Sequence, residues 1–395
     1  MVSRMSASAE ARPPARVLPV IVLAQLLGVS PWFAVNAVMP DLQAAYGWPP
    51  ASVGTLTAAL TLGFIGGTLA FALFGVADRH KPRHVFFACA LAAALATLAA
   101  VQVAASFTAL LVLRVATGFF LAGIYPVGMK IAALWFPRGL GIALGWLVGA
   151  LVLGSAAPHG LRAAGVGWEW QGVFVVIAVL AALAGALVLF GVPEPPAPAA
   201  PPPRLKIAAL ATLWTDRRVR ASAFGYFGHM WELYTLWVLL PAILATRIAS
   251  SVAVSWAAFL VLGAGALGCI GGGLLVRRFG GARVAGVQLA LSGGCCLLAP
   301  WLLGAPVPWF MAWLLLWGIT VVGDSPQFSA LTASNAPREA VGSVLTLTNS
   351  IGFGISVLSI ELFVHLAAAL PLATLLPWLG IGPLLGLWAL RPLLR

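Results

Sequence analysis

Residues 75–83 read GVADRHKPR, a short charged turn between two long apolar runs. A second turn, GLLVRRFGGAR at residues 273–283, has the same basic character and follows an apolar run in the second half of the chain. The two turns occupy corresponding places when the sequence is divided into halves. Matching turns of this kind indicate a duplicated unit, as in membrane proteins that are built from internal repeats.

The runs on either side of these turns are apolar enough to form membrane helices. Hydrophobic residues make up 62% of the 395 positions and charged residues only 8%, whereas soluble domains carry about 25% charged residues. Backbone groups in lipid must pair internally, and the runs lack the two-residue alternation of barrel strands. We therefore expect an all-α integral membrane protein with about 20 apolar residues in each span. The sequence predicts twelve spans, at residues 17–40, 52–76, 84–104, 107–130, 139–158, 170–191, 220–245, 252–276, 284–303, 307–328, 340–364 and 369–391.

A proline-rich segment divides the twelve predicted spans into two sets of six. It begins at Pro193, includes the run Pro201-Pro202-Pro203 and continues through basic residues to position 219. Proline runs favour extended backbone and cannot continue a helix. We therefore predict two pseudo-symmetric six-helix bundles, at residues 1–192 and 220–395, joined by a linker at residues 193–219.

The distribution of Lys and Arg predicts the orientation in the membrane. If the N-terminus lies inside, nearly all of the 22 basic residues fall in inner segments; Arg162 and Arg247 lie at outer loops, and Arg114 lies within a span. Cytoplasmic loops are enriched in Lys and Arg. We therefore expect both termini in the cytoplasm, and we expect a monomer in a bacterial inner (plasma) membrane.

Composition and motifs also exclude other classes of protein. The net charge is +12, but the basic residues are scattered between apolar runs, so we expect no nucleic-acid partner. The four cysteines lie inside apolar runs and match neither a disulfide framework nor a zinc site. The sequence shows no phosphate-binding loop, metal cluster or nucleophile–base pair. We therefore expect no enzyme activity, no metal and no cofactor.

Six helices, a central linker, six further helices and a basic turn after the second helix of each half resemble the major facilitator superfamily. The resemblance covers essentially the whole chain. The family's loop signature is Gly-x-x-x-Asp-Arg/Lys-x-Gly-x-Arg; the second turn matches it with Arg277 in place of the acid. The first turn keeps the charged part, with Phe74 and Lys81 in place of the two glycines. The resemblance implies that these charges link helices at a cytoplasmic gate, formed by Asp78, Arg79, Arg83, Arg277, Arg278 and Arg283.

Two further motifs bear on the subgroup. Arg114-x-x-x-Gly118 resembles the fourth-helix motif of the family, which implies that Arg114 serves proton coupling or the charge of the substrate. Only half of the family's drug-exporter signature is present, because Ala150 stands where its proline belongs. Nitrate porters of the family carry an Arg in the second and eighth helices, but residues 52–76 and 252–276 contain no Lys or Arg. Neither drug export nor nitrate transport is expected.

Ionisable residues in the middle of a span are costly and mark functional sites by default. In the seventh predicted helix Tyr226, His229 and Glu232 recur at spacing three and share one face. Glu232 lies near the midpoint of that helix, at the depth where secondary transporters bind their substrates. We expect Glu232 with His229 to carry a coupling proton. The alternative is a buried Glu–His pair that only holds the helix against its neighbour.

Other polar residues within the predicted spans suggest a substrate cavity. Arg114 stays charged when it is buried, so it needs a carboxylate such as Glu232 or an anionic substrate; a static ion pair is the alternative. In the tenth predicted helix Asp324 either joins the proton coupling or caps the break at Pro326 near the inner end of the helix. Gly66–Gly67, Gly145 with Gly149, and Gly271–Gly273 predict closely packed helices. The predicted cavity residues are Arg114, Tyr125, Tyr226, Asn349, Asn36 and Trp317.

These patterns favour a secondary active transporter that moves a small organic solute through a central cavity by alternating access, coupled to protons. The partners expected are the solute, protons and the lipid bilayer. Two alternatives remain open. One is an uncoupled facilitator or uptake carrier for a planar aromatic solute such as a vitamin. The other is a membrane receptor or scaffold that transports nothing.

Overall fold

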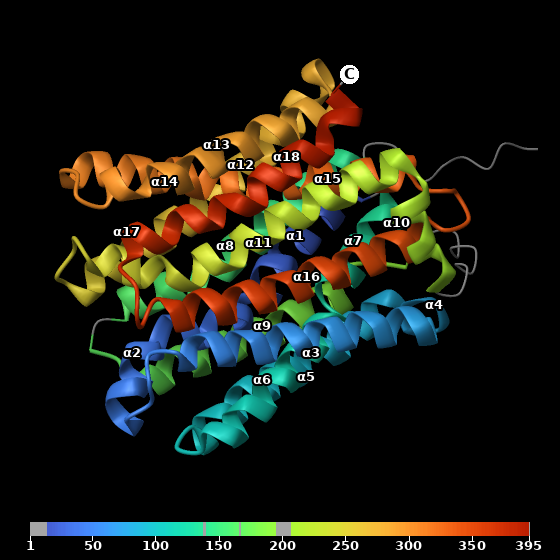
Figure 1. Ribbon diagram of the computed structural model, residues 1–395. Coiled ribbons are helices and arrows are strands. Elements are labelled where there is room, and N and C mark those ends of the chain that lie inside the picture. The colour runs from blue at the N-terminus through green and yellow to red at the C-terminus, as the bar shows by residue number, and fades with distance from the viewer. Residues whose placement is uncertain (1–13, 137–139, 166, 195–206, 395) are drawn as a thin grey trace, which may run out of the picture.

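The computed structural model describes residues 14–136, 140–165, 167–194 and 207–394 (Figure 1). In this part of the chain twelve helices are long and apolar enough to cross a membrane. No strand occurs among the described residues. The twelve spans expected from the apolar runs are therefore confirmed. Residues 195–206 of the predicted linker lie outside the described residues.

The first six spans are built from nine elements, because two of the spans are interrupted, and a tenth element, α4, lies between spans. The bounds are α1 (Val17–Gly28), η1 (Ser30–Phe33), α2 (Ala34–Tyr46), α3 (Ser52–Phe74), α4 (Val76–Arg79), α5 (Pro82–Val103), α6 (Phe107–Leu121), α7 (Tyr125–Trp135), α8 (Leu140–Ala164) and α9 (Trp170–Gly191). The first span comprises α1, η1 and α2, and the fourth comprises α6 and α7. The short α4 lies in the charged turn that follows the second span.

The last six spans follow a similar plan. The bounds are η2 (Ile207–Ala211), α10 (Thr212–Thr215), α11 (Arg217–Ala245), α12 (Ser251–Phe279), α13 (Gly281–Leu302), α14 (Val307–Gly323), α15 (Ser325–Asn335), α16 (Val341–Leu366), α17 (Leu372–Leu375), η3 (Leu376–Gly380) and α18 (Ile381–Leu394). The tenth span comprises α14 and α15 and runs to Asn335. The end expected at residue 328 is therefore wrong, and the structure places Asp324 near the middle of the span, not near its inner end.

The same pairs of helices pack together within each half of the molecule. In the first half α3 packs on α6, α5 on α9, and α1 on both α8 and α9. In the second half the equivalent pairs are α12 with α14, α13 with α18, and α11 with both α16 and α18. Across the two halves α3 packs on α16 and α8 packs on α12, which again are equivalent pairs. The fold is therefore two pseudo-symmetric six-helix bundles, as the sequence predicts.

Three spans are interrupted near the middle, each at a proline in the first turn of the element that follows. The prolines are Pro31 in η1, Pro126 in α7 and Pro326 in α15. Proline lacks the backbone N–H that would continue the helical hydrogen bonds and clashes with the preceding turn. The interruptions in the fourth and tenth spans are equivalent by the pseudo-symmetry. They bend the chain at the depth where its buried ionisable residues lie.

Glycines let the two equivalent pairs α3–α6 and α12–α14 approach to backbone contact. A Cβ placed on Gly118 would overlap the carbonyl group of Leu60, and one on Gly268 would overlap that of Ile319. Helices in lipid pack closely where such small residues face each other. Of the glycines expected from the sequence to let helices pack closely, only some lie at a close contact. A Cβ on Gly67 would overlap Phe119, whereas a Cβ on Gly66, Gly145, Gly271 or Gly273 would meet no described atom within 4 Å, so these four are not packing residues.

Candidate functional site: buried acids in the second bundle

The middle of α11 carries a carboxyl group that is fully enclosed by protein. Glu232 has 0% exposure. Its oxygens accept hydrogen bonds from Trp317 Nε1 of α14 at 2.5 Å, from Ser292 Oγ of α13 at 3.0 Å and from Cys296 Sγ of α13 at 3.2 Å. All three donors are neutral groups. The structure therefore builds a neutral cradle around Glu232, and no described Lys, Arg or His forms an ion pair with it.

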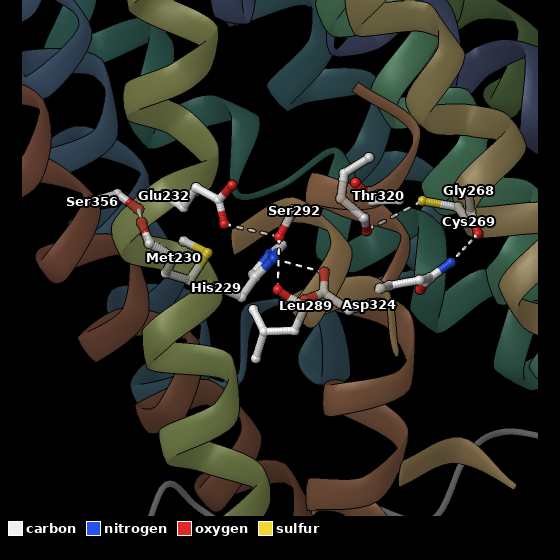
Figure 2. A network of polar contacts seen from close by, with 12 residues as sticks. His229, Met230, Glu232, Gly268, Cys269, Leu289, Ser292, Thr320, Asp324 and Ser356 are labelled. Carbon is white, nitrogen blue, oxygen red and sulfur yellow. Dashed lines mark hydrogen bonds and ion pairs between the residues drawn. The ribbon is translucent and has the colours of Figure 1, made fainter. Parts of the chain in front are cut away.

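Ser292 can satisfy Glu232 in either protonation state (Figure 2). Its Oγ lies 3.0 Å from Glu232 Oε2 and 3.2 Å from the carbonyl oxygen of Leu289. A serine hydroxyl offers one donor and two acceptor lone pairs. When Glu232 is ionised, the hydroxyl donates to the carboxylate. When Glu232 is protonated, the hydroxyl can turn to donate to Leu289 and accept the proton of the acid. A proton can thus be gained or lost here without leaving the carboxyl group unpaired.

A second buried acid, Asp324, pairs with His229, which lies one turn before Glu232 on α11. His229 Nδ1 lies 2.8 Å from Asp324 Oδ1, and both side chains are almost completely buried. Asp324 occupies the interruption between α14 and α15. The other ring nitrogen of His229, Nε2, is buried and has no hydrogen-bond partner among the described residues. Buried polar atoms are usually hydrogen-bonded, so this pair is held close but is not saturated.

The structure separates two residues that the sequence groups together. His229 and Glu232 share a face of α11, but His229 points toward Asp324 whereas Glu232 points toward Ser292 (Figure 2). The buried Glu–His pair considered from the sequence does not form. Spacing along one helix places both side chains correctly on the same face. It cannot show which neighbouring helix each side chain contacts.

Arg114 binds the backbone of the first span, not a carboxylate. Its Nη1 donates to the carbonyl oxygen of Pro31 at 2.9 Å and its Nη2 to that of Trp32 at 2.6 Å, and the side chain is 2% exposed. Of the two partners considered from the sequence, a carboxylate such as Glu232 is not the one that Arg114 contacts, and an anionic substrate stays a prediction. Both carbonyls belong to η1, the short 3-10 turn between α1 and α2, and a carbonyl oxygen has two lone pairs, so Pro31 O can accept from Arg114 as well as from the backbone N–H of Ala34. These carbonyls supply the partner that the buried guanidinium requires.

The remaining predicted cavity residues come from five helices, namely α2, α7, α11, α14 and α16. Trp317 is fully buried beside Glu232. Tyr226 is buried, with its ring centroid 5.7 Å from that of His229. Asn36 donates to Thr57 Oγ1 at 3.0 Å and also lines a cavity described below. Tyr125 begins α7 and is half-buried, and Asn349 is half-buried in the middle of α16.

A cluster of aromatic rings at the junction of the two bundles is not predicted from the sequence. We call it the aromatic cluster. Tyr234 stacks on Trp32 with a centroid distance of 5.9 Å and an interplanar angle of 11°, and on Phe33 at 6.2 Å and 8°. Phe64 and Phe353 meet edge to face at 4.8 Å. Nε1 of Trp32 is buried without a partner among the described residues. The cluster consists of Trp32, Phe33, Phe64, Tyr234, Trp237 and Phe353.

A cavity of about 700 Å³ lies between the two halves at one end of the molecule. Its lining comes from α2, α3 and α8 of the first half and from α11 and α12 of the second. Asp41 and Arg162, which both line it, form a bidentate ion pair with N–O distances of 2.8 and 3.0 Å. His159 also lines the cavity, is 2% exposed and has no partner for its Nε2 among the described residues. Asn36 and Val238 extend the lining to positions close in sequence to the aromatic cluster.

The charged turn at residues 75–83 lies at the other end of the second span. Asp78 pairs with Lys130 of α7, which also donates to the carbonyl oxygen of Ala77 at 2.6 Å. Glu194 accepts hydrogen bonds from Lys81 at 2.5 Å and from Arg83 at 2.8 Å. The hydrogen bond from Lys81 lowers the pKa of Glu194, so Glu194 stays ionised at neutral pH and loses this contact only when the pH falls through that lowered value.

The predicted gate charges of the first turn therefore join it to α7 through Asp78 and to Glu194, at the start of the predicted linker, through Arg83. Arg79 lines the cavity of about 440 Å³ beside this turn and is exposed. In the second half Arg277, Arg278 and Arg283 form no ion pair with any described residue. Arg277 occupies the position that Asp78 has in the first turn, so the second turn lacks the acid that forms the ion pair with Lys130 in the first. No group of His, Cys, Asp and Glu that could hold a metal ion occurs in the described ranges.

Comparison with known proteins places the chain among transporters. Residues 21–360 match the model of the Major Facilitator Superfamily. No curated protein matches the sequence significantly. Among solved structures, the human organic anion transporter MFSD10 (TETRAN) is similar with a TM-score of 0.74 and 18% identity, covering 96% of this chain and 100% of that one.

Two further structures are similar over most of the chain. The nucleoside transporter NupG, solved as a point mutant, has a TM-score of 0.71 and 14% identity, covering 96% of this chain and 100% of that one. A bacterial homolog of the human lysosomal transporter Spinster, in an inward-facing and occupied conformation, has a TM-score of 0.67 and 18% identity, covering 89% of this chain and 81% of that one. At these identities the likeness shows a common fold.

Proposed function

The chain belongs to the major facilitator superfamily, and from this premise we propose that it is a secondary active transporter that carries a small organic solute by alternating access and couples this movement to protons. That it is a multi-pass membrane transporter follows from the family and the twelve spans. Two of the similar structures are an organic anion transporter and a nucleoside transporter, which supports a small organic solute. Support for proton coupling comes from the buried residues Glu232, His229 and Asp324.

The observation that carries the proposal is the environment of Glu232. Holding a charge deep in a membrane protein costs several kcal/mol unless a partner compensates it. Glu232 has neutral donors and no cationic partner among the described residues. A proton is therefore the species that can neutralise it, and Ser292 can serve both forms of the acid. A carboxyl group with a purely structural role would not require a partner such as Ser292, which can pair with both the protonated and the ionised form.

The His229–Asp324 pair supplies a second place for a proton. An imidazole nitrogen and a carboxylate oxygen can each hold a proton, and Asp324 Oδ1 lies 2.8 Å from Nδ1 of His229. Asp324 occupies the interruption between α14 and α15, so a change of charge at this pair acts directly on the junction of two half-helices. We assign Glu232, His229 and Asp324 to proton coupling. Movement of α14 and α15 relative to α11 would then link protonation to the change between the two access states.

The cavity between the halves supports alternating access. It opens at the end of the molecule opposite the turn at residues 75–83, whereas the aromatic cluster joins the two bundles deeper in the molecule. We propose that the end with the basic turns faces the cytoplasm of a bacterial cell, in accordance with the positive-inside rule. Both termini would then be cytoplasmic, with bundles at residues 1–192 and 220–395, a linker at residues 193–219, and a monomer as the working unit.

One specific observation favours a second candidate within transport, a carrier of planar aromatic solutes. Trp32 and Tyr234 belong to different bundles and lie almost parallel, with their centroids 5.9 Å apart. Two rings with a third between them would need about 7 Å, because stacked aromatic atoms contact at about 3.5 Å. A small separation of the bundles would therefore admit a planar ring. The buried Nε1 of Trp32 would be available to an acceptor on that ring.

Transport and coupling can be tested together. A thermal-shift screen of metabolites on the purified protein identifies a solute that binds, and that solute is then offered to protein in proteoliposomes. We expect accumulation against a concentration gradient when a pH gradient is imposed, and loss of accumulation when a protonophore is added. Uptake that only equilibrates, with or without the pH gradient, would favour the uncoupled facilitator. Binding without any transport would favour a receptor or scaffold.

A further inference from the structure

A separate cavity of about 300 Å³ lies where the start of α11 meets the end of α18. Three arginines converge on it from these two helices, namely Arg217, Arg220 and Arg391. The rest of its lining is apolar and includes Phe224 and Trp388. No Asp or Glu is among the described residues that line it. It therefore combines three positive charges with an apolar wall, at the end of the molecule that carries the basic turns.

The charges in this cavity are not neutralised by the described part of the chain. Arg217 and Arg391 form no ion pair there, and Arg220 donates only to the backbone carbonyl oxygen of Trp214 at 2.8 Å. The acid nearest in sequence, Asp216, uses Oδ1 to cap α11 by accepting from the backbone N–H groups of Arg218 and Val219 at 2.7 and 3.0 Å. Three guanidinium groups thus remain available to an external anion.

The apolar wall continues onto the outer surface of the helices. Trp388 is 66% exposed, and Trp214 of α10, beside Arg220, is 63% exposed. Exposed tryptophans at the ends of membrane spans lie at the level of the lipid headgroups, where their rings contact acyl chains and glycerol. The cavity therefore faces the region of the bilayer in which phosphate groups are found. A ligand that fits it has an anionic head and an apolar body.

We propose that this cavity binds the phosphate of an anionic phospholipid, with Arg217, Arg220 and Arg391 holding the phosphate and Trp388 and Phe224 packing against the glycerol and the start of the acyl chains. Guanidinium groups bind phosphate through paired N–H donors, and basic pockets between membrane helices at the cytoplasmic side bind anionic headgroups. The lipid would connect the first helix of the second bundle to the last. It would stabilise this bundle without touching Glu232, His229 or Asp324.

The test measures lipid binding and needs no transported solute. The parent protein in detergent is titrated with phosphatidylglycerol, with phosphatidylcholine or with inorganic phosphate, and the melting temperature and the lipids retained in native mass spectra are recorded. We expect phosphatidylglycerol alone to raise the melting temperature and to remain bound. Replacing all three residues (Arg217→Gln, Arg220→Gln, Arg391→Gln) should abolish the shift, and Arg391→Gln alone should weaken binding about fivefold.

Arg218→Gln is the matched control, because Arg218 is an exposed neighbour that does not line the cavity. It should bind phosphatidylglycerol like the parent. If the triple variant binds like the parent, or if the control loses binding to the same extent, the assignment to this cavity is wrong. If inorganic phosphate raised the melting temperature as much as phosphatidylglycerol does, the cavity would be a site for free anions. If phosphatidylcholine did so, binding would not depend on the negative charge of the lipid. Each of these outcomes overturns the proposal and leaves the proton-coupling proposal unaffected.

Discussion

Single residues in this protein show that a buried charge is satisfied by whatever partner the local backbone offers. Arg114 is held by the carbonyl oxygens of Pro31 and Trp32, and Glu232 by three neutral donors. Both residues stand out in the sequence because ionisable groups are rare in membrane spans. Their partners could not be read from the sequence, because the partners depend on the rotation of each helix and on where Pro31 interrupts the first span.

The contacts of Arg114 predict that it stabilises the fold. In Arg114→Gln the carbonyl groups of Pro31 and Trp32 lose the guanidinium donors, Pro31 O keeps the backbone N–H of Ala34, and a buried group left unsatisfied costs about 1–3 kcal/mol. We expect a clearly lowered melting temperature in detergent. Arg114→Lys should restore only part of it, because one ammonium lacks the planar fork that reaches both carbonyls. A variant with the parent's melting temperature but no solute binding would show instead that Arg114 serves the substrate.

At the level of helices, proline interruptions determine how deep in the molecule the buried ionisable residues and their partners lie. Prolines interrupt the first, fourth and tenth spans, and the interruptions place Arg114's partners and Asp324 in the middle of the molecule. The sequence reveals each proline but not whether the helix ends there or continues beyond it. The tenth span continues for eleven residues as α15, so the expected location of Asp324 near the inner end was wrong. The number of spans was predictable, because that depends only on the apolar runs.

Because α3 packs closely on α6, a single added methyl group at their contact should lower the stability of the protein. In Gly118→Ala the new Cβ would overlap the carbonyl group of Leu60, and overpacking of this kind costs about 1–3 kcal/mol. We expect a lower melting temperature for Gly118→Ala. Gly66→Ala is the matched control on α3, because nothing lies within 4 Å of its Cβ position. Equal melting temperatures for the two variants would show that the two helices can separate at little cost.

The turn at residues 75–83 predicts an effect on rate. Asp78 holds the turn against Lys130 of α7, within the first bundle and far along the chain from the buried acids. Asp78→Asn removes the ion pair with Lys130, so the turn and α7 are less firmly joined when the first bundle moves during transport. We expect a transport rate that is several-fold lower and a solute affinity within a few-fold of the parent's, measured by uptake and by equilibrium binding. A loss of binding with normal exchange kinetics would contradict this role.

The whole molecule is organised by a pseudo-twofold relation between its bundles, but its polar residues do not follow that relation. The same helix pairs pack in each half, whereas the buried acids Glu232 and Asp324 are confined to the second half of the described chain. The repeat could be predicted from the two basic turns, because duplication preserves the spacing of spans and loops. The aromatic cluster between the bundles could not, because its rings come from elements that are distant in the sequence.

Orientation of the whole molecule can be checked independently of any solute. A reporter that is active only in the cytoplasm should function when it is fused after Arg204 and fail when it is fused after Arg162. The physical reason is the retention of basic segments on the cytoplasmic side during insertion. The opposite pair of outcomes would reverse the orientation and place the cavity between the halves on the cytoplasmic side.

If a proton bound at Glu232 drives transport, solute should accumulate in proteoliposomes under an imposed pH gradient only when residue 232 can titrate. Glu232→Gln keeps the size and hydrogen-bonding capacity of the protonated acid but cannot titrate. We expect this variant to bind and exchange the solute yet accumulate none, whereas Glu361→Gln, at a partly exposed acid paired with His365, should accumulate solute like the parent. Accumulation by Glu232→Gln equal to that of the parent would contradict this role of Glu232.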